Sequence, residues 1–214
     1  MAIEELRVGG SVKLKGPIKL NVVDVAGSIS IEGDAEVREF RISGSGKITG
    51  NLKAEEVKTA GSIKVEGDLE AREVEVSGSA KVGGLLKTKT LEIAGSLKTD
   101  NIEADVVRIA GGLTATKVVA DQVFIGRKSS VHGTIIACEI EIGRDAEVDK
   151  VIGYKVLIRR GAEANYVEAQ NVIVEKDAEI YMLRYVENAQ IHSKAEIDKV
   201  EKIDKLSYEL KCEE

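Results

Sequence analysis

Apolar and polar residues alternate in short runs along almost the whole chain. Residues 61–77 (GSIKVEGDLEAREVEVS) show three such runs, with breaks at Gly67-Asp68 and at Arg72-Glu73. A period of two is typical of β-strands, whereas an amphipathic helix needs an apolar spacing of about 3.6 residues. The pattern therefore predicts three short strands in this stretch and no helix.

This stretch is one unit of a repeat. The dipeptide Gly-Ser recurs at a constant interval, beginning at Gly10, Gly27, Gly44, Gly61, Gly78 and Gly95. The next equivalent, Gly111-Gly112, comes one position earlier than that interval predicts. One inward position of the repeat stays apolar almost throughout, and it holds Val25, Ile42, Thr59, Val76, Ile93, Ile109, Ile125, Ile142, Ile158, Val174 and Ile191.

The repeat is expected to continue into the C-terminal half. Its inward columns keep their character after Gly-Ser disappears, while the corners change to the Asp-Ala-Glu-Val type seen at 145–148. Because the inward pattern continues while the corner sequence changes, we predict one fold whose corners are of two kinds.

Strands that follow each other at so short an interval leave no room for a crossover helix, so they can be parallel only if the chain coils. We predict an all-β, single-stranded parallel β-helix of about 12 rungs, each of about 17 residues and with three sides. A strict six-residue repeat would favour a left-handed coil, and its absence favours a right-handed one. The predicted organisation is one domain over 1–214, with a lead-in at 1–9, rungs at 10–200 and a C-terminal cap or edge strand at 201–214.

Composition and charge narrow the class of protein. The net charge is −6 with both signs mixed along the chain, which argues against nucleic acid as a partner because that needs a basic surface. No apolar run of about 18 residues predicts a transmembrane segment, and residues 1–10 do not resemble a signal peptide. Cys138 and Cys212 have no metal or redox spacing and are interpreted as free thiols in a reducing compartment. We therefore expect a cytoplasmic protein.

The sequence offers little catalytic chemistry. The two histidines, His132 and His192, are expected on the surface without a perturbing neighbour, and neither has the spacing of a metal ligand to a cysteine or to the other histidine. We predict no catalytic residue, no cofactor and no metal, and hence no enzyme. One alternative stays open: left-handed relatives are often acyltransferases, which would need His132 or His192 in a subunit interface.

Tyrosine is unevenly distributed. All five tyrosines lie in the C-terminal third, at Tyr154, Tyr166, Tyr181, Tyr185 and Tyr208. The preferred interpretation is that they fill wider rungs and a capping surface, while the other is a partner surface formed by the first four, because tyrosine is favoured at interfaces. An alternative function, a carbohydrate-binding or carbohydrate-active β-helix, would use a groove lined by acids and tyrosines in this region.

The repeat units 61–76 (GSIKVEGDLEAREVEV) and 78–93 (GSAKVGGLLKTKTLEI) resemble bactofilins, and the similarity extends over about residues 8–200. The resemblance implies a right-handed triangular β-helix that polymerises end to end without nucleotide and acts as a cellular scaffold. The family's membrane-docking N-terminal segment has no counterpart in residues 1–6, so membrane docking is not expected. The rod predicted here also has about twice the rungs usual in the family.

Elementary physics also favours self-association. The end rungs of a solenoid expose unpaired N–H and C=O groups together with the apolar interior, so they must be capped or paired. The predicted assembly interface comprises Leu6, Val8, Val12 and Leu14 at the N-terminal end, and Leu206, Tyr208 and Leu210 at the C-terminal end. Charges at the C-terminus would discourage stacking there, which makes the N-terminal end the better candidate.

Overall fold

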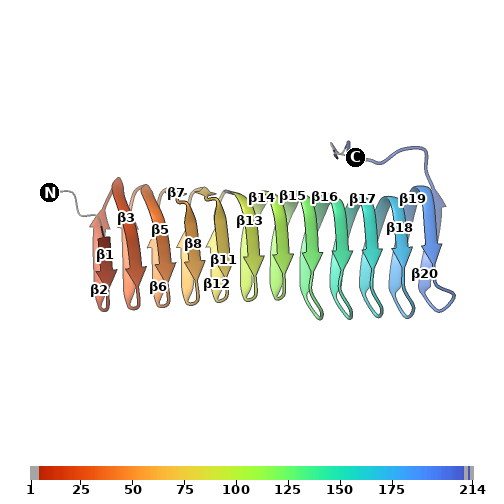
Figure 1. The fold of residues 1–214 in the computed structure, drawn as a ribbon, viewed down its shortest axis with the longest axis horizontal. Coiled ribbons are helices and arrows are strands. Elements are labelled where there is room, and N and C mark those ends of the chain that lie inside the picture. Colours follow the sequence, from red (N-terminus) through yellow and green to blue (C-terminus); the bar gives the residue numbers. More distant parts are fainter. Residues whose placement is uncertain (1–4, 210–211, 213–214) are drawn as a thin grey trace. The chain divides into compact units, whose positions relative to one another are not determined.

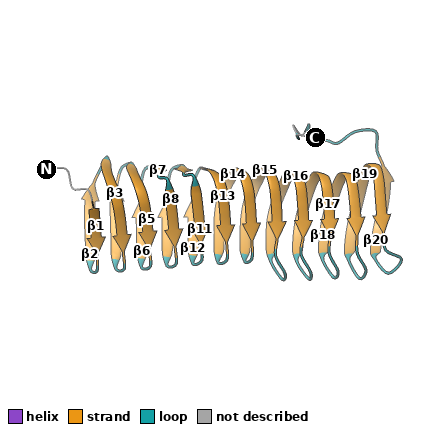
Figure 2. Ribbon diagram, viewed as in Figure 1, coloured by secondary structure: helices purple, strands orange, loops and turns teal. Residues whose placement is uncertain are grey.

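The computed structural model describes residues 5–209 and Cys212, and it divides the chain into two compact units with the boundary between Ala104 and Asp105. Both units consist of parallel strands, and the described residues include no helix (Figure 2). Together the strands make a β-solenoid of about 12 turns. The predicted fold class is confirmed, while the handedness stays a prediction.

In unit 1 the turns are built from short strands that are separated by corners. The strands are β1 (Glu5–Val8), β2 (Ser11–Lys15), β3 (Ile18–Val25), β4 (Ser28–Glu32), β5 (Ala35–Ile42), β6 (Ser45–Ile48), β7 (Leu52–Lys53), β8 (Glu56–Thr59), β9 (Ser62–Val65), β10 (Leu69–Glu70), β11 (Glu73–Val76), β12 (Ser79–Val82), β13 (Leu85–Ile93) and β14 (Ser96–Ile109), which contains the unit boundary. β6, β7 and β8 pair with β9, β10 and β11 of the next turn, each in a register of one full repeat. This pairing confirms the three predicted sides.

In unit 2 each turn is one long, bent strand instead of three short ones. The strands are β15 (Gly112–Ile125), β16 (Ser130–Ile142), β17 (Glu147–Ile158), β18 (Glu163–Val174), β19 (Glu179–Ile191) and β20 (Glu196–Lys202). Each pairs in parallel with its neighbour in the chain, so that successive turns lie side by side (Figure 1).

The core of each unit is made from the predicted inward columns. Val25, Ile42 and Thr59 are buried in unit 1, and Ile125, Ile142 and Ile158 occupy the same column in unit 2. The exception is Ile191, which is 40% exposed. Ile191 keeps its predicted column, because it is the register partner of Val174. It is exposed because β20 pairs with β19 only as far as Tyr185, and no later strand among the described residues covers it.

The Gly-Ser corners of unit 1 stack so closely that only glycine fits. A Cβ atom on Gly61 would lie 2.0 Å from the carbonyl oxygen of Gly44 in the preceding turn, and one on Gly78 would lie 2.0 Å from that of Gly61. Real Cβ atoms do not approach backbone oxygen so closely, so the repeat of glycine follows from the stacking of the turns. At Gly112, where Gly-Ser ends, a Cβ would meet no atom within 4 Å.

Unit 2 turns its corners with a left-handed residue instead. Lys128, Asp145, Gly161 and Asp177 occupy successive corners and have φ values of 57°, 55°, 66° and 59°. Glycine and aspartate tolerate this conformation better than most residues. The residue that follows is Ser129 or an alanine, and it is buried at each of these corners. The predicted change of corner chemistry is thus confirmed and has a backbone cause.

Candidate assembly ends and the C-terminal strap

The N-terminal end of unit 1 is an open edge. β1 pairs with β3 and β2 pairs with β4, and neither has a strand partner on its other side among the described residues. Leu6, Val12 and Leu14 on these strands are partly exposed, whereas Val8 is 8% exposed. The N-terminal residues predicted to form an assembly interface thus lie on unpaired strands, with apolar surface beside free backbone groups.

The last strand of unit 2, β20, carries mainly charged side chains. It pairs only with β19 among the described residues, and its sequence EIDKVEK holds five charged residues. Val200 at its middle is 51% exposed. An end with this much charge is less suited to stacking than the N-terminal end of unit 1.

After β20 the chain turns back along the side of unit 2. Residues 203–209 and Cys212, here called the C-terminal strap, form no strand, so that of the predicted alternatives, a cap or an edge strand over 201–214, only the cap stays a prediction for them. The amide of Ile203 donates to the carbonyl of Tyr185 at 2.9 Å, and that of Ser207 donates to Glu168 Oε1. Figure 1 shows the strap leaving β20 and running back over this unit. Leu206 and Tyr208 therefore lie in the strap, and Leu210 lies outside the described residues.

The far end of the strap reaches strands near the start of unit 2. Lys117 Nζ of β15 lies 3.4 Å from the Tyr208 hydroxyl and 4.5 Å from the centroid of its ring. Such a cation–π contact adds to the hydrogen bond. Cys212 then forms a disulfide with Cys138 of β16, with a Cα–Cα distance of 5.5 Å. The strap thus crosses several turns and is held at both of its ends.

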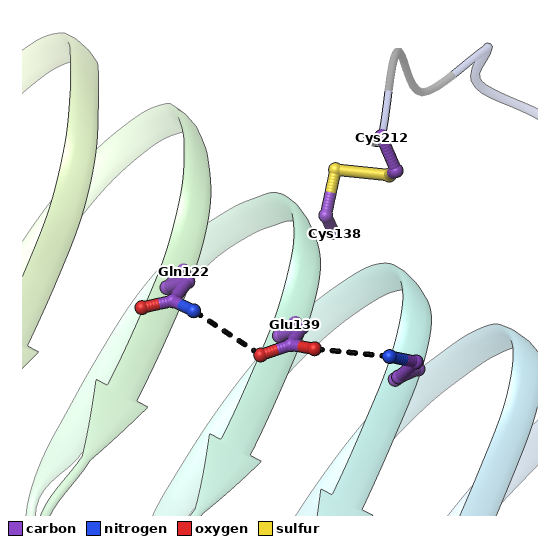
Figure 3. Close-up of a disulfide and its surroundings, with 5 residues drawn as sticks. Gln122, Cys138, Glu139 and Cys212 are labelled. Carbon is purple, nitrogen blue, oxygen red and sulfur yellow. Dashed lines mark hydrogen bonds and ion pairs between the residues drawn. A yellow bond between two sulfur atoms is a disulfide. The ribbon is translucent and has the colours of Figure 1, made fainter. Parts of the chain in front are cut away.

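The disulfide corrects the prediction of two free thiols. Cys138 and Cys212 are 74 residues apart, and nothing in their spacing signals a pair. Figure 3 shows the disulfide beside Gln122 and Glu139, whose side chains are hydrogen-bonded at 3.2 Å across neighbouring strands. The amine of Lys155 donates to the same glutamate at 3.1 Å. The strap is therefore fastened next to a polar ladder on the outer surface.

Glu168 is the acid that the strap covers. Its side chain is 0% exposed, and it accepts a hydrogen bond of 2.6 Å from the Tyr166 hydroxyl as well as the one from Ser207. Burial opposes ionisation, but the hydrogen bonds from Ser207 and Tyr166, with help from the nearby Arg184, outweigh it and lower the pKa of Glu168. Burial and then Glu168 raise the pKa of Tyr166. The carboxylate is thus charged and buried because the strap supplies donors.

The tyrosines do not fill the core, so the preferred interpretation of them as rung fillers is wrong. None of the five is among the buried side chains, and Tyr154 and Tyr181 are 37% and 55% exposed. Tyr185 contacts the strap through its carbonyl, Tyr208 belongs to the strap, and Tyr166 donates to Glu168, the acid that the strap covers. Tyr181 instead lines a groove on another part of the surface, and Tyr154 does not line that groove. The four residues of the predicted partner surface therefore do not share one place.

That groove is acidic. It has a volume of about 450 Å³ and is lined by Glu147, Glu163, Glu179 and Glu196, with Asp149, Asp198, His132 and Tyr181 among the other lining residues. The four glutamates are register partners in consecutive strands, and none forms an ion pair with a described residue. Stacked like charges repel each other, so the groove carries a concentrated negative potential.

His132 has neighbours that its sequence did not reveal. Ser130 Oγ lies 3.3 Å from His132 Nε2, and Asp149 Oδ1 lies 3.6 Å from His132 Nδ1. The order resembles a hydrolytic triad, but 3.6 Å is too long for a hydrogen bond, and Asp149 instead accepts from the Gly133 amide at 3.0 Å. The side chains of His132 and Asp149 are 60% and 44% exposed. This arrangement gives the serine no activated base.

Two kinds of feature are absent from the part of the chain that the structure describes. No group of three or more histidine, cysteine or acidic side chains in residues 5–209 is arranged to hold a metal ion. In the same residues, no helix is long and apolar enough to cross a lipid bilayer.

Comparison with known proteins gives one match. Residues 3–100 match the family model of the bactofilins, which are described as polymer-forming cytoskeletal proteins. No curated protein and no solved structure matches the chain. The matched region falls entirely in unit 1 and includes the repeat units that suggested the resemblance. The chain therefore carries a bactofilin domain, of the polymer-forming cytoskeletal family, over residues 3–100.

Proposed function

We propose that this protein is a non-enzymatic structural scaffold of the cytoplasm that assembles end to end through its terminal turns without a nucleotide. The observation that carries the proposal is the open N-terminal edge of unit 1. There the unpaired strands β1 and β2 bring partly exposed Leu6, Val12 and Leu14 to the surface. Another copy would pair the free backbone groups and bury these side chains in one contact.

The two ends differ in charge, which supports a different part for each end in assembly. β20 and the residues after it carry closely spaced acids and bases around an exposed Val200, and desolvating them on stacking would cost free energy. β2 keeps its lysines on exposed positions, which alternate with the partly exposed Val12 and Leu14. We therefore propose that the N-terminal ends join first, so that the smallest assembly is a pair of copies in contact through β1 and β2.

Light scattering and negative-stain microscopy over a range of protein concentrations test this proposal. Wild-type protein is expected to form assemblies without added nucleotide, and Val12→Lys to weaken them strongly, because a buried lysine would replace an apolar contact. Val200→Lys at the other end is the matched control and is expected to form the N-terminal pair of copies like wild type. Circular dichroism verifies that both variants keep their sheet. Monomers at every concentration, or a Val12→Lys protein that assembles normally, would contradict the proposal.

The acidic groove supports a second candidate, a carbohydrate-binding surface. Its carboxylates can accept hydrogen bonds from sugar hydroxyls, and the exposed ring of Tyr181 offers a face for a sugar to stack on. The test is calorimetric titration with neutral and amino-sugar oligosaccharides. Binding that is lost in Tyr181→Ala but kept in Tyr154→Ala, which alters a tyrosine outside the groove, would support this function. Absence of heat with both ligand classes would dismiss it.

A further inference from the structure

One outer column of unit 2 holds two buried isoleucines, although its position in the turn faces away from the core. Ile136 and Ile152 are 3% and 4% exposed, and the register places them in one column with Val119, Glu168 and Arg184. In unit 1 the residues at the same position of the turn are Glu36, Lys53, Glu70 and Lys87, all of which are exposed. Something other than the sheet must therefore exclude water from the two isoleucines.

The C-terminal strap is the segment in the right place to do so. Its Ser207 contacts Glu168, which follows Ile152 in the column. Its Tyr208 contacts Lys117, two residues before Val119, and its Cys212 is bonded to Cys138, two residues after Ile136. The isoleucines lie between these contacts, so the strap spans them. Leu206, which is only partly exposed, supplies apolar surface in the strap itself.

Among the described residues, the disulfide is the only covalent cross-link between the strap and the strands that it crosses. Without it, the strap is held by the hydrogen bonds of Ile203 and Ser207 and by the contact of Tyr208 with Lys117. Each bond of this kind contributes little net stability, because it replaces bonds to water, although a charged partner strengthens it somewhat. A segment of this length with so few contacts is marginal on its own, because ordering each residue costs a comparable amount of free energy.

We propose that the Cys138–Cys212 disulfide is a redox-controlled latch, which when closed holds the strap over Ile136 and Ile152 and when opened uncovers them. Both cysteines are partly exposed, so a small thiol can reach the sulfur atoms. The thiolate of glutathione attacks one sulfur, forms a mixed disulfide and expels the other cysteine as a thiolate. A second glutathione then releases the protein, leaving two cysteine thiols and one glutathione disulfide.

The proposed cytoplasmic location favours a disulfide that opens and closes over one that is permanent. Disulfides are rare in the cytoplasm of most organisms, and those found there are usually transient or redox-sensing. Only the preference for a switch over a permanent bond rests on the proposed function, because it assumes a cytoplasmic location. The latch is tested with added glutathione and does not require assembly. A negative result for the latch would therefore leave the assembly proposal unaffected, and a protein that does not assemble would leave the latch unaffected.

Hydrogen–deuterium exchange of residues 203–209, together with binding of a fluorescent apolar dye, tests the latch. Excess glutathione is expected to speed exchange of the strap about tenfold or more and to raise dye binding, with the sheet signal in circular dichroism retained. Cys212→Ser is expected to show the same open state without reductant. In that background, Ile152→Ser is expected to remove most of the added dye binding, because it removes the uncovered apolar surface.

Three results would overturn the latch. The first is a disulfide that survives excess glutathione, since the pair would then be a permanent staple. The second is a Cys212→Ser protein whose strap exchanges as slowly as that of the oxidised wild type. The third is loss of the sheet signal on reduction, which would show that the disulfide maintains the fold and not the strap alone. The double variant with both cysteines changed to serine controls for effects of glutathione elsewhere, and it is expected not to respond.

Discussion

Unit 1 and unit 2 have similar inner columns and very different outer ones. In unit 1, Lys19, Glu36, Lys53, Glu70 and Lys87 are register partners that alternate in charge, and Lys19 and Glu36 form an ion pair of 2.8 Å. In unit 2 the same position holds isoleucines that are buried on the outside of the coil. The comparison teaches that the inward residues determine the coil, whereas the outward residues determine what the coil can contact.

The outer surface of the first side of each turn also differs in charge between the units. Lys47, Lys64, Lys81 and Lys98 are register partners in unit 1 and are partly balanced by Glu66. On the first strand of each turn in unit 2, Glu147, Glu163, Glu179 and Glu196 form the unbalanced acidic ladder. One fold thus presents a basic strip in one unit and an acidic groove in the other. Four substitution experiments test the differences between the two units.

The corner comparison is expected to give the largest effect. Gly61→Ala places a Cβ 2.0 Å from a backbone oxygen and is expected to lower the free energy of unfolding of unit 1 by about 3 kcal/mol. Gly112→Ala in unit 2, where nothing lies within 4 Å, is expected to change the free energy of unfolding of that unit by less than about 0.5 kcal/mol. Denaturant unfolding followed by circular dichroism measures both. Equal effects would show that the glycine repeat has another cause.

The outer column is expected to come next. Ile152→Ala is expected to lower the free energy of unfolding of unit 2 by about 2 kcal/mol, the lower end for a buried isoleucine, because the strap can adjust to the smaller side chain. Lys53→Ala, at the same position of the turn in unit 1, is expected to have almost no effect because its side chain is exposed. If the two substitutions proved equally mild, the strap would not cover Ile152.

Glu168 is expected to give a smaller effect that depends on pH. The lowered pKa means that its stabilising contribution is fully present above the ordinary value of 4.5 and is lost as the pH falls through the folded value. The protection of the strap amides, which is the intrinsic exchange rate at a given pH divided by the observed rate, should therefore fall in acid. Glu168→Gln should cost about 1 kcal/mol at neutral pH by weakening hydrogen bonds to a charged group, and its strap should respond less to acid. Arg184 and Tyr166, the other ionisable groups near this carboxylate, stay protonated in this range.

The acidic ladder is expected to give the smallest effect and the opposite sign. Glu163→Gln lies between two like charges and should raise the free energy of unfolding of unit 2 by about 0.5 kcal/mol. The gain should shrink as salt screens the repulsion. Glu36→Gln, which breaks an ion pair in unit 1, is the matched control and should be slightly destabilising. Thermal denaturation at low and high salt separates the two signs.

The repeat made most of the fold predictable. Each inward column recurs once in every turn, so one correctly interpreted turn predicted the burial of Ile42, Ile93 and Ile158 in distant turns. The N-terminal edge was predictable for the same reason, because a stack of turns must have a first one. Repetition gives many observations of a single environment, and random exceptions such as Thr59 do not hide it.

The strap could not be predicted in this way because it occurs once. Its contacts join Ser207 to Glu168 and Tyr208 to Lys117, and pairs so far apart leave no periodic trace. The two cysteines gave no signal of pairing either, because two cysteines far apart in the sequence indicate free thiols more often than a disulfide. A signal did exist: Ile136 and Ile152 stand at an outward position where unit 1 carries charges. Apolar residues at outward positions of a solenoid indicate that another segment covers them.

The glycine stack of unit 1 also limits how this protein can change in length. Each corner glycine fits only beneath the glycine of the turn before it, so an insertion or deletion of a few residues would bring a side chain against a backbone oxygen. Adding or removing one whole turn would preserve every such contact. Unit 1 can therefore lengthen or shorten only in fixed steps of about 4.8 Å, the spacing between neighbouring strands. Duplication of a turn offers a simple route to new lengths of the same domain.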